Sequence, residues 1–272
     1  MTIAYGLIQP ADLSLPELPD SLEGLKIAHL SDIHITRHRD RHNLLINQLA
    51  SIRLDLVVLT GDYMTRKGDE PHAIQMLERM LGRVKPKYGS YGVFGNHDSM
   101  EFREKVKQLP ISWLSNLTCR AADGVIELFG LDTNWPSLSD AASLVLDWKQ
   151  KTRAVGTETF TGKTLRLMIS HFPTCLATAS DIGINLVLAG HTHGGQCRLP
   201  YAKTLLNACD LPLKLSSGLI RHRNTLMAIS RGLGEANLPI RAFCPAHVPV
   251  YTLHKRAMQG INTNRFDLLW KW

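Results

Sequence analysis

Short apolar runs alternate with amphipathic stretches along most of the chain. Runs of aliphatic and β-branched residues are typical of buried strands, whereas apolar residues spaced three and four apart are typical of helices that pack on one face. Over the first hundred residues the pattern predicts strands at 25–30, 54–60 and 91–94 and helices at 43–52 and 73–81. This alternation of strand and helix is typical of the α/β class.

The pattern continues less regularly to residue 254. It predicts an amphipathic helix at 100–109, a helix at 141–151 and a polar loop at 156–162. Further strands are predicted at 111–114, 117–120, 125–131, 165–169, 185–188, 225–230 and 250–253. Since no linker, repeat or low-complexity segment separates these elements, the expected fold class is α/β.

Length and composition fit a single folding unit. The 272 residues, of which 44% are hydrophobic and 20% charged, can bury a large core. We therefore predict one domain over 1–272, with a core at 24–254 and a C-terminal tail at 255–272. The formal charge of +7 favours anionic partners such as phosphate esters, nucleic acid or an acidic membrane surface.

Cysteine usage and hydropathy bear on location. The five cysteines are scattered and form no CxxC pair, which argues against a disulfide framework or zinc knuckle and fits a reducing cytoplasm. The first twenty residues lack a basic start followed by an apolar run, so no export signal is predicted. No eighteen uncharged apolar residues run together, so we expect any membrane contact to be peripheral, on the inner face.

Small polar clusters follow five of the predicted strands. In α/β sheets ligands bind at the carboxyl ends of strands, where side chains far apart in sequence converge. The clusters are Ser31–His34, Thr60–Asp62, Gly95–Asp98, Ser170–His171 and Gly190–Gln196. Taken singly, the first, second and fourth fit an ordinary turn or a packed histidine better than a ligand set.

The third and fifth clusters are more specific. Asn96, His97 and Asp98 supply an amide oxygen, an imidazole and a carboxylate in a row, which an ordinary turn rarely needs. His191 and His193 stand two apart between glycines, a spacing typical of metal ligands. Together the five clusters supply the ligands of a two-metal site that clamps phosphoryl oxygens.

The donor types bear on the metal. Imidazole, carboxylate and amide oxygen without thiolate favour Mn, Fe or Zn over Ca and argue against a structural zinc site. We expect two divalent ions, Mn first, with Fe, Zn or Mg as alternatives.

The order of these blocks resembles the calcineurin-like metallophosphoesterases. Their signature is DxH, GDxx(D), GNH(D/E), a lone H and GHxH, and all five blocks stand here in that order between 24 and 254. The later RLP, SGL, SRGLG, PIR and CP segments resemble the small bacterial branch with the YkuE-like and YaeI-like proteins. The resemblance implies a four-layer α/β/β/α sandwich of two packed mixed sheets, with the metal site at the strand carboxyl ends.

The resemblance also implies roles for single residues. His97 would act on the leaving-group oxygen as general acid or transition-state stabiliser, with Asp98 orienting its ring. Asp62 would be the ligand that bridges the two metals. The reaction would be an in-line attack on phosphorus by a metal-bridging hydroxide, without a covalent intermediate. The remaining ligands would be Asp32, His34 and His193 for one metal and Asn96, His171 and His191 for the other.

The sequence departs from the family pattern at two places. Thr65 stands where many members have an acid, and Ile35 and Thr36 replace an apolar-Gly step. Both departures lie beside the ligands and bear on the shape of the substrate entrance.

An apolar segment follows the GHxH block. Residues 198–217 carry Lys203 and Lys214 and six leucines, Leu199, Leu205, Leu206, Leu211, Leu213 and Leu215. The leucines either fold onto the core, which is slightly favoured, or form an apolar lip for the acyl chains of a lipid phosphate. Residues 255–272 mix aromatic and basic residues, which suits either a membrane interface or a terminal strap.

Several arginines are candidates for phosphate binding. Arg37 and Arg39 directly follow DxH, and Arg221, Arg231 and Arg241 lie further along the chain. Such clusters are usually solvated faces, but guanidinium groups bind phosphate when they border a metal site.

These observations predict a cytoplasmic metal-dependent phosphodiesterase or pyrophosphatase. The resemblance, the lip and the charge favour a lipid-linked substrate such as UDP-2,3-diacylglucosamine, whose hydrolysis gives UMP and an acyl-sugar phosphate in the lipid A precursor pathway. A general phosphodiesterase, nuclease or cyclic-nucleotide phosphodiesterase is the alternative, although no aromatic stacking residues accompany the basic cluster, which disfavours nucleic acid. A non-catalytic scaffold is a remote alternative because every ligand position is filled.

Overall fold

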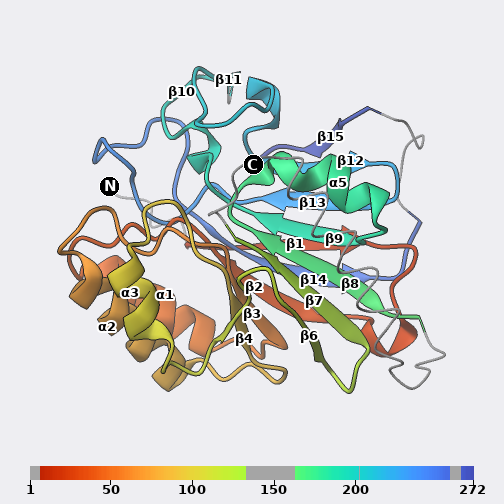
Figure 1. The fold of residues 1–272 in the computed structure, drawn as a ribbon. Helices are drawn as coiled ribbons and strands as arrows, with labels where there is room; N and C mark the ends of the chain where they lie inside the picture. The colour runs from red at the N-terminus through yellow and green to blue at the C-terminus, as the bar shows by residue number, and fades with distance from the viewer. Residues whose placement is uncertain (1–6, 133–162, 202, 258–264) are drawn as a thin grey trace.

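The computed structural model describes residues 7–132, 163–201, 203–257 and 265–272. Its strands form two large sheets that pack face to face, and helices cover the outer faces (Figure 1). No helix in these ranges combines the length and the hydropathy needed to cross a bilayer.

The first sheet combines the N-terminal half of the chain with one late strand. Its strands, in spatial order, are β1 (Ile8–Ser14), β14 (Val248–His254), β2 (Lys26–Leu30), β3 (Leu56–Leu59), β4 (Ser90–Gly92) and β5 (Ser112–Trp113). Strands β2 to β5 are parallel, and β14 runs antiparallel to β2. The outer face carries α1 (Asp40–Ala50), α2 (Glu70–Arg83) and α3 (Met100–Val106).

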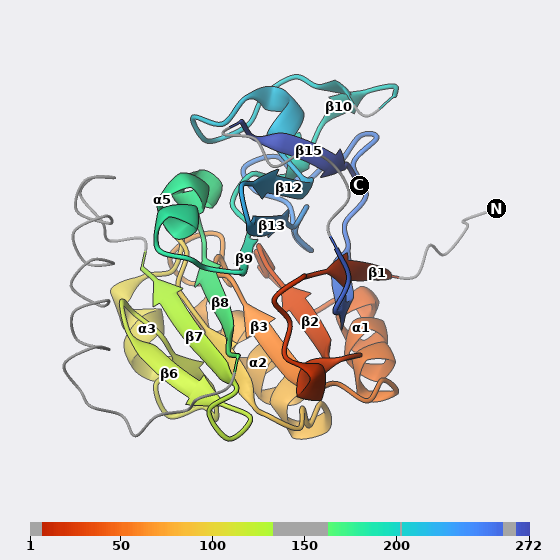
Figure 2. The same cartoon turned by 90° about the vertical axis from the view of Figure 1, so that its right-hand side faces the viewer.

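The second sheet is built from the C-terminal half. Its strands, in spatial order, are β15 (Asp267–Trp270), β12 (Gly218–His222), β13 (Thr225–Ile229), β9 (Leu186–Ala189), β8 (Leu165–Ser170), β7 (Ile126–Leu131) and β6 (Thr118–Ala121). Strands β13, β9, β8 and β7 are parallel. Helix α5 (Leu176–Asp181) covers the outer face (Figure 2).

Short elements connect these strands. They are the 3-10 helices η1 (Asp20–Leu22), η2 (Pro173–Cys175), η3 (His193–Gly195) and η4 (Leu213–Leu215), and the two-stranded ribbon of β10 (Arg198–Leu199) and β11 (Lys203–Thr204).

Three apolar clusters fill the three interfaces between layers. In β3, Leu56 and Val58 face the second sheet, whereas Val57 and Leu59 face the helices. A third cluster lies between the second sheet and α5. Because β3 is buried on both faces, its sequence is a continuous apolar run and not an alternating one. The predicted four-layer α/β/β/α sandwich of two mixed sheets is confirmed.

Most predicted strands correspond to observed ones, including the edge strands β5 and β6, but the sequence does not predict the other edge of either sheet, β1 and β15. The sequence gives no strand signal at β1, since Pro10 and Asp12 interrupt it; β1 is an edge strand, where proline is tolerated. Strands β12 and β15 and helix α5 were also not predicted. The segments predicted at 141–151 and 156–162 lie outside the described residues.

The end of the chain is part of the second sheet. Strand β15 pairs with β12, and the indole of Trp272 is buried. Its Nε1 donates to the carbonyl of Ile229 at 2.8 Å, and its backbone oxygen accepts from Arg198 at 2.8 Å and Ser217 at 3.1 Å. The last eight residues therefore form a strap on the second sheet, in which Phe266, Leu269 and Trp270 stay exposed.

We expect Trp272→Ala to lower the free energy of unfolding by about 3 kcal/mol, because it removes a buried ring and a hydrogen bond. Urea unfolding followed by circular dichroism measures the change. Trp270→Ala, which removes a half-exposed ring of the same type, is the matched control and should change stability by about 0.5 kcal/mol or less. Equal losses in the two variants would contradict the role given to Trp272.

Candidate metal centre

The predicted ligands meet where the parallel strands of both sheets end. Each ligand sits within a few residues of a strand's carboxyl end, so the convergence follows from the parallel arrangement. Asp32 and His34 follow β2, Asp62 follows β3, Asn96 follows β4, His171 follows β8, and His191 and His193 follow β9.

The ligand atoms form two groups that share one carboxylate. Asp32, His34, Asp62 and His193 each place one ligand atom within 4.8 Å of the others, and so do Asp62, His171 and His191. The Oδ2 atom of Asp62 lies 3.3 Å from Nε2 of His34 and 3.3 Å from Nε2 of His171. The arrangement suits two metal ions with Asp62 between them.

Asn96 extends the second group. Its Oδ1 lies 3.0 Å from Nε2 of His171, which places an amide oxygen beside the imidazoles.

The histidine tautomers in the second group fit a cation. Nδ1 of His171 donates to the carbonyl of Thr60 at 2.7 Å, and Nε2 of His191 donates to the carbonyl of Ala208 at 2.9 Å. In neutral rings the other two nitrogens, 3.2 Å apart, are then both acceptors. Two facing acceptors need a positive charge, which either a proton on His171 or a metal ion between the rings supplies, and carbonyls that fix the tautomer are common behind metal-bound histidines.

The charges in the cluster support each other. Burial opposes ionisation of Asp62, but His171 and His34 hold the pKa of its carboxyl well below the usual value. Burial also opposes the charge of His171, yet Asp62 and Asp32 raise the pKa of this imidazole to about 9. Burial lowers the pKa of His193 to about 3, so its ring stays neutral. Burial opposes ionisation of Asp32 as well, but His193 and His171 lower the pKa of its carboxyl, so two carboxylates face one protonated imidazole and the cluster attracts cations.

Five of the ligands adopt left-handed backbone conformations. The φ angles are 49° for Asp32, 43° for His34, 56° for Asp62, 70° for His191 and 50° for His193. Few residues other than glycine adopt such angles, and each costs on the order of 1–3 kcal/mol. Such strain is common where function fixes the backbone.

Two glycines of the SRGLG segment form a wall of the centre. A Cβ atom at Gly232 would lie 2.6 Å from Cβ of Asp32, and one at Gly234 would lie 2.1 Å from the carbonyl of Ile33. No larger residue fits at either place without moving the DxH loop. In the sequence this segment served only to support the resemblance to the bacterial branch. Its two glycines are nevertheless a signal that the backbone passes close to another part of the chain.

His97 lies at the centre, but its ring is oriented differently from the prediction. Its Nδ1 lies 2.8 Å from the carbonyl of Thr65, and its backbone N–H donates to Oδ1 of Asp62 at 2.9 Å. Asp98 accepts from the backbone N–H groups of Asp62, Tyr63 and Gly95 at 2.9, 2.8 and 2.7 Å. Burial and Asp62 raise the pKa of Asp98 to about 7. Thr65 orients His97, and Asp98 positions the loop that carries Asp62.

Arg221 does not face the centre. It pairs with Leu226 on β13, which is level with the start of β9, whereas the ligands follow the end of β9. Its side chain is buried, and Nη2 lies 3.8 Å from Asp267. The prediction that Arg221 binds substrate is therefore wrong, because the guanidinium is enclosed at the opposite end of the sheet.

Arg231 is close to the ligands but turned away from them. Its Nε donates to His247 at 3.3 Å and its Nη2 to Gln9 at 3.1 Å. Burial lowers the pKa of Arg231 to about 10. Its side chain is buried against these partners. The prediction that Arg231 binds substrate is therefore wrong. Arg37 and Arg39 are exposed, and Nη1 of Arg39 lies 3.8 Å from Glu235.

Arg241 ties two loops of the centre together. Its guanidinium donates to the carbonyls of Arg231 at 2.9 Å, Gly232 at 3.3 Å and His193 at 3.4 Å, and also to Gly234. Nη2 lies 3.3 Å from Nδ1 of His193. A residue that resembles a phosphate binder in the sequence is thus a brace between the loop of His193 and the glycine wall.

The leucines of residues 198–217 were expected either to pack on the core or to form an exposed apolar lip, and the structure shows some of each. Leu215 is buried, whereas the side chains of Leu199, Leu205, Leu206 and Leu213 are 43%, 48%, 77% and 43% exposed. The core therefore accounts for Leu215 but not for these four.

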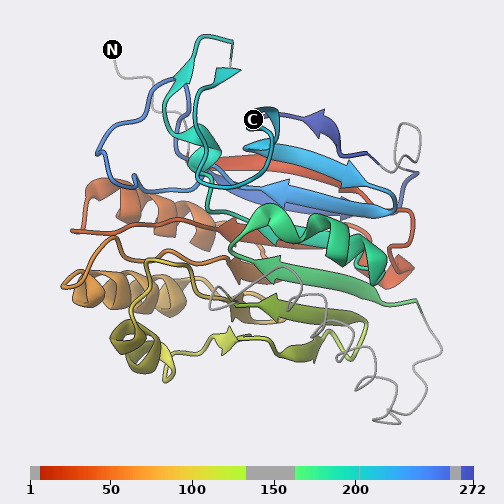
Figure 3. The same ribbon diagram turned by 45° about the horizontal axis from the view of Figure 1, so that its top comes forward.

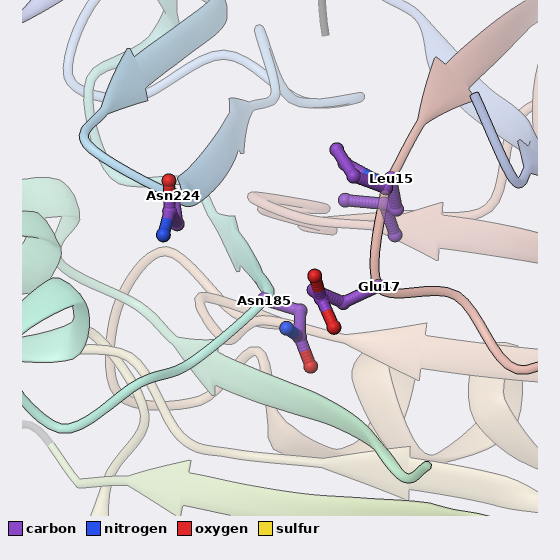
Figure 4. Close-up of a pocket in the computed structure, with 5 residues that line it drawn as sticks. Leu15, Glu17, Asn185 and Asn224 are labelled. Atoms are coloured by element: carbon purple, nitrogen blue, oxygen red, sulfur yellow. The ribbon is translucent and has the colours of Figure 1, made fainter. Parts of the chain in front are cut away.

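A small cavity lies between the segment that follows β1 and the loops at one end of the second sheet. It measures about 80 Å³ and is lined by Leu15, Pro16, Glu17, Asn185 and Asn224 (Figure 4). Asn185 precedes β9, whereas the ligands follow this strand. The cavity is thus separate from the metal centre.

We expect Arg241→Lys to weaken Mn(II) binding by about 10- to 100-fold at the group that contains His193, because lysine cannot bridge the same carbonyls. Manganese titration followed by electron paramagnetic resonance measures both groups. Arg221→Lys, a buried arginine far from the centre, is the control and should bind as the wild type does. Unchanged titration of Arg241→Lys would contradict the bracing role.

Comparison with known proteins places this geometry in a family. A family model described as calcineurin-like phosphoesterase matches residues 25–195. The metallophosphoesterase YkoQ of Bacillus subtilis is 28% identical over 220 residues, covering 80% of this chain and 79% of that protein. YkuE of the same organism is 25% identical over 239 residues, covering 87% and 81%.

A third relative has a substrate in its name. The UDP-2,3-diacylglucosamine pyrophosphatase LpxG of Chlamydia muridarum is 24% identical over 287 residues, covering 87% of this chain and 86% of that protein. With a family model spanning most of the chain and an Asp/His cluster suited to two metal ions, the chain belongs to the calcineurin-like metallophosphoesterases and is a phosphoester hydrolase.

Proposed function

We propose that this protein hydrolyses a phosphodiester or pyrophosphate bond in a lipid-linked substrate, such as UDP-2,3-diacylglucosamine. The observation that carries the proposal is the Asp62 carboxylate, which belongs to both groups of ligand atoms. A bridging carboxylate is typical of centres that bind two ions about 3.5–4 Å apart and act on phosphoryl oxygens.

The side chains divide the work of binding. Asp32, His34 and His193 would hold one ion, Asn96, His171 and His191 the other, and Asp62 both. When bound, two divalent ions neutralise phosphoryl oxygens and activate water as the nucleophile. We propose Mn(II) because the donors are nitrogen and oxygen without thiolate.

His97 is proposed to act on the leaving group. The carbonyl of Thr65 accepts from Nδ1 of His97 at 2.8 Å, so the ring nitrogen left for the substrate is Nε2. The ring lies edge-on to His34 at 4.9 Å between centroids, which puts it beside the ligands while leaving it half-buried. From there Nε2–H of the protonated ring could donate to the departing oxygen.

Two observations support a lipid-linked substrate. The name of the Chlamydia relative includes UDP-2,3-diacylglucosamine, and exposed Leu205 and Leu206 lie close in sequence to Ala208, whose carbonyl holds His191. The apolar segment thus contacts the metal centre through the backbone of Ala208. Hydrolysis would add water across the diphosphate and release UMP and the acyl-sugar phosphate.

The proposed place of action is the cytoplasmic face of a membrane. All five cysteines lie in the described residues and are free, which suits a reducing compartment. Peripheral contact would bring the centre to a substrate that is held in the bilayer.

The deciding experiment compares turnover of UDP-2,3-diacylglucosamine, bis(p-nitrophenyl) phosphate and cyclic AMP by the Mn(II)-loaded protein. We expect the lipid nucleotide to have the highest kcat/KM and Asp62→Ala to abolish turnover of all three. If only bis(p-nitrophenyl) phosphate is hydrolysed, the proposal of a lipid-linked substrate is wrong and a general phosphodiesterase is the remaining function. No turnover of any of them would contradict the proposed function.

We expect His97→Ala to lower kcat by about 10²- to 10⁴-fold while the Mn(II) content stays unchanged, since His97 would move a proton and bind no ion. Steady-state kinetics and elemental analysis of the same preparation test both parts. His72→Ala on α2 is the control and should keep full activity. Loss of manganese from His97→Ala would make this residue a ligand instead.

A further inference from the structure

Exposed apolar side chains are concentrated on two loops beside the metal centre. Of the fourteen large hydrophobic residues that are exposed among the described residues, eight lie between 199 and 243. We call this set the apolar crest: Leu199, Tyr201, Leu205, Leu206, Leu213, Leu238, Ile240 and Phe243. Single exposed apolar residues are ordinary, but a group of this size on neighbouring loops marks an interaction surface.

The two loops, 198–217 and 234–243, are joined by hydrogen bonds at their bases. The backbone N–H of Arg198 donates to the carbonyl of Ala242 at 2.8 Å, and Ala242 donates to the carbonyl of Gln196 at 3.1 Å. The side chain of Gln196 also donates to the carbonyls of Ala236 and Leu238 at 3.1 and 2.9 Å. Figure 3 shows both loops projecting together beyond the sheets, on the side where the ligands lie.

The crest is fixed at its base to the loop that carries the ligands. Nε of Arg198 donates to the carbonyl of Gly194 at 2.7 Å, next to His193, and Ala208 accepts from His191 at 2.9 Å. The apolar tips are therefore held in place relative to the metal centre, and a partner that binds them also positions its own reactive group.

Two aromatic residues of the crest are largely exposed. Tyr201 is fully exposed with φ 64°, and Phe243 is 65% exposed with φ 50°. A bulky side chain is disfavoured in the left-handed region, and burial offsets this little, since Tyr201 is fully exposed and Phe243 mostly so. A binding partner for the rings explains why they stand there.

The charges around the crest indicate an anionic partner. Exposed Lys203 and Lys214 lie between the apolar residues, with Asp210 as the exposed acid of the same segment. The chain carries a formal charge of +7. Aromatic and aliphatic tips between lysines are the composition that binds the interface of an anionic bilayer, where rings sit at the headgroups and lysines meet phosphate.

We propose that the apolar crest inserts into the surface of an anionic lipid bilayer and holds the metal centre over the headgroups. The insertion itself follows from the crest, whereas its purpose, access to a lipid-linked substrate, rests on the proposed function. The crest is the proposed contact; the C-terminal segment, where Phe266, Leu269 and Trp270 are exposed, pairs with β12 and has Trp272 buried.

Sedimentation with vesicles tests the insertion. The Mn(II)-loaded protein is mixed with vesicles of phosphatidylethanolamine and phosphatidylglycerol, and separately with vesicles of phosphatidylcholine alone. We expect binding to the anionic vesicles that weakens with salt, and about tenfold weaker binding for the double variant Tyr201→Asn, Phe243→Asn. Asparagine tolerates the left-handed conformation, so the variant keeps its fold.

The controls separate the crest from apolar exposure in general. The double variant Met100→Asn, Leu117→Asn removes two exposed apolar side chains elsewhere and should bind vesicles as the wild type does. Hydrolysis of bis(p-nitrophenyl) phosphate should be unchanged in both double variants, which shows that the fold and the metal centre are intact.

Three results would overturn the insertion. The wild type binds no vesicles, or the crest variant binds them as well as the wild type does, or the crest instead pairs with a second copy, seen as a dimer that the crest variant loses. Vesicle binding without hydrolysis of UDP-2,3-diacylglucosamine would leave the insertion standing and remove the proposed substrate. Hydrolysis of UDP-2,3-diacylglucosamine without vesicle binding would overturn the insertion and leave the proposed substrate standing.

Discussion

The Asp62 carboxylate is the constraint on which the rest of the metal centre depends. It is buried, so keeping it ionised costs free energy unless donors and positive charge surround it. The backbone N–H of His97 donates to it, and His34 and His171 lie 3.3 Å away. Two bound cations would complete this compensation, so the site suits metal ions.

Fixing Asp62 requires the strand ends of both sheets. Asp98 holds the backbone of Asp62 from the loop after β4, and the carbonyl of Thr60 orients His171 on the second sheet. The left-handed backbone of the ligands is supported by bonds between neighbouring loops, such as Asp32 N–H to the carbonyl of Gly61 at 3.0 Å. The three apolar interfaces of the sandwich stabilise the strands and so offset strain that a single loop could not hold.

The sequence specified the centre well because its information is local. Each ligand cluster directly follows an apolar run, and strands buried on both faces, such as β3, are readable as continuous apolar stretches. A parallel sheet then brings the clusters to one edge without further information. The four-layer sandwich and the convergence of the seven predicted ligands were thus available from the sequence through the resemblance and strand positions.

What the sequence could not supply depends on long-range packing. Arg221 and Arg231 look like phosphate binders in the sequence, because nothing local indicates that one is enclosed at the far end of β12 and the other is bound to His247. From the sequence, Asp98 is expected to orient its neighbour His97. In the structure its carboxylate instead accepts hydrogen bonds from the backbone N–H groups of Asp62 and Gly95. The edge strands β1 and β15 have weak patterns because half of their surroundings is solvent.

The apolar crest likewise depends on long-range packing that the sequence does not show. Leu206 and Leu215 are equivalent in the sequence, but one is 77% exposed and the other 1%. The difference arises because Gln196 and Arg198 fasten the two loops at their bases and leave the tips outside any core. Since residues 190–198 carry both this fastening and the ligands His191 and His193, a lipid surface that fixes the crest also fixes one side of the metal centre.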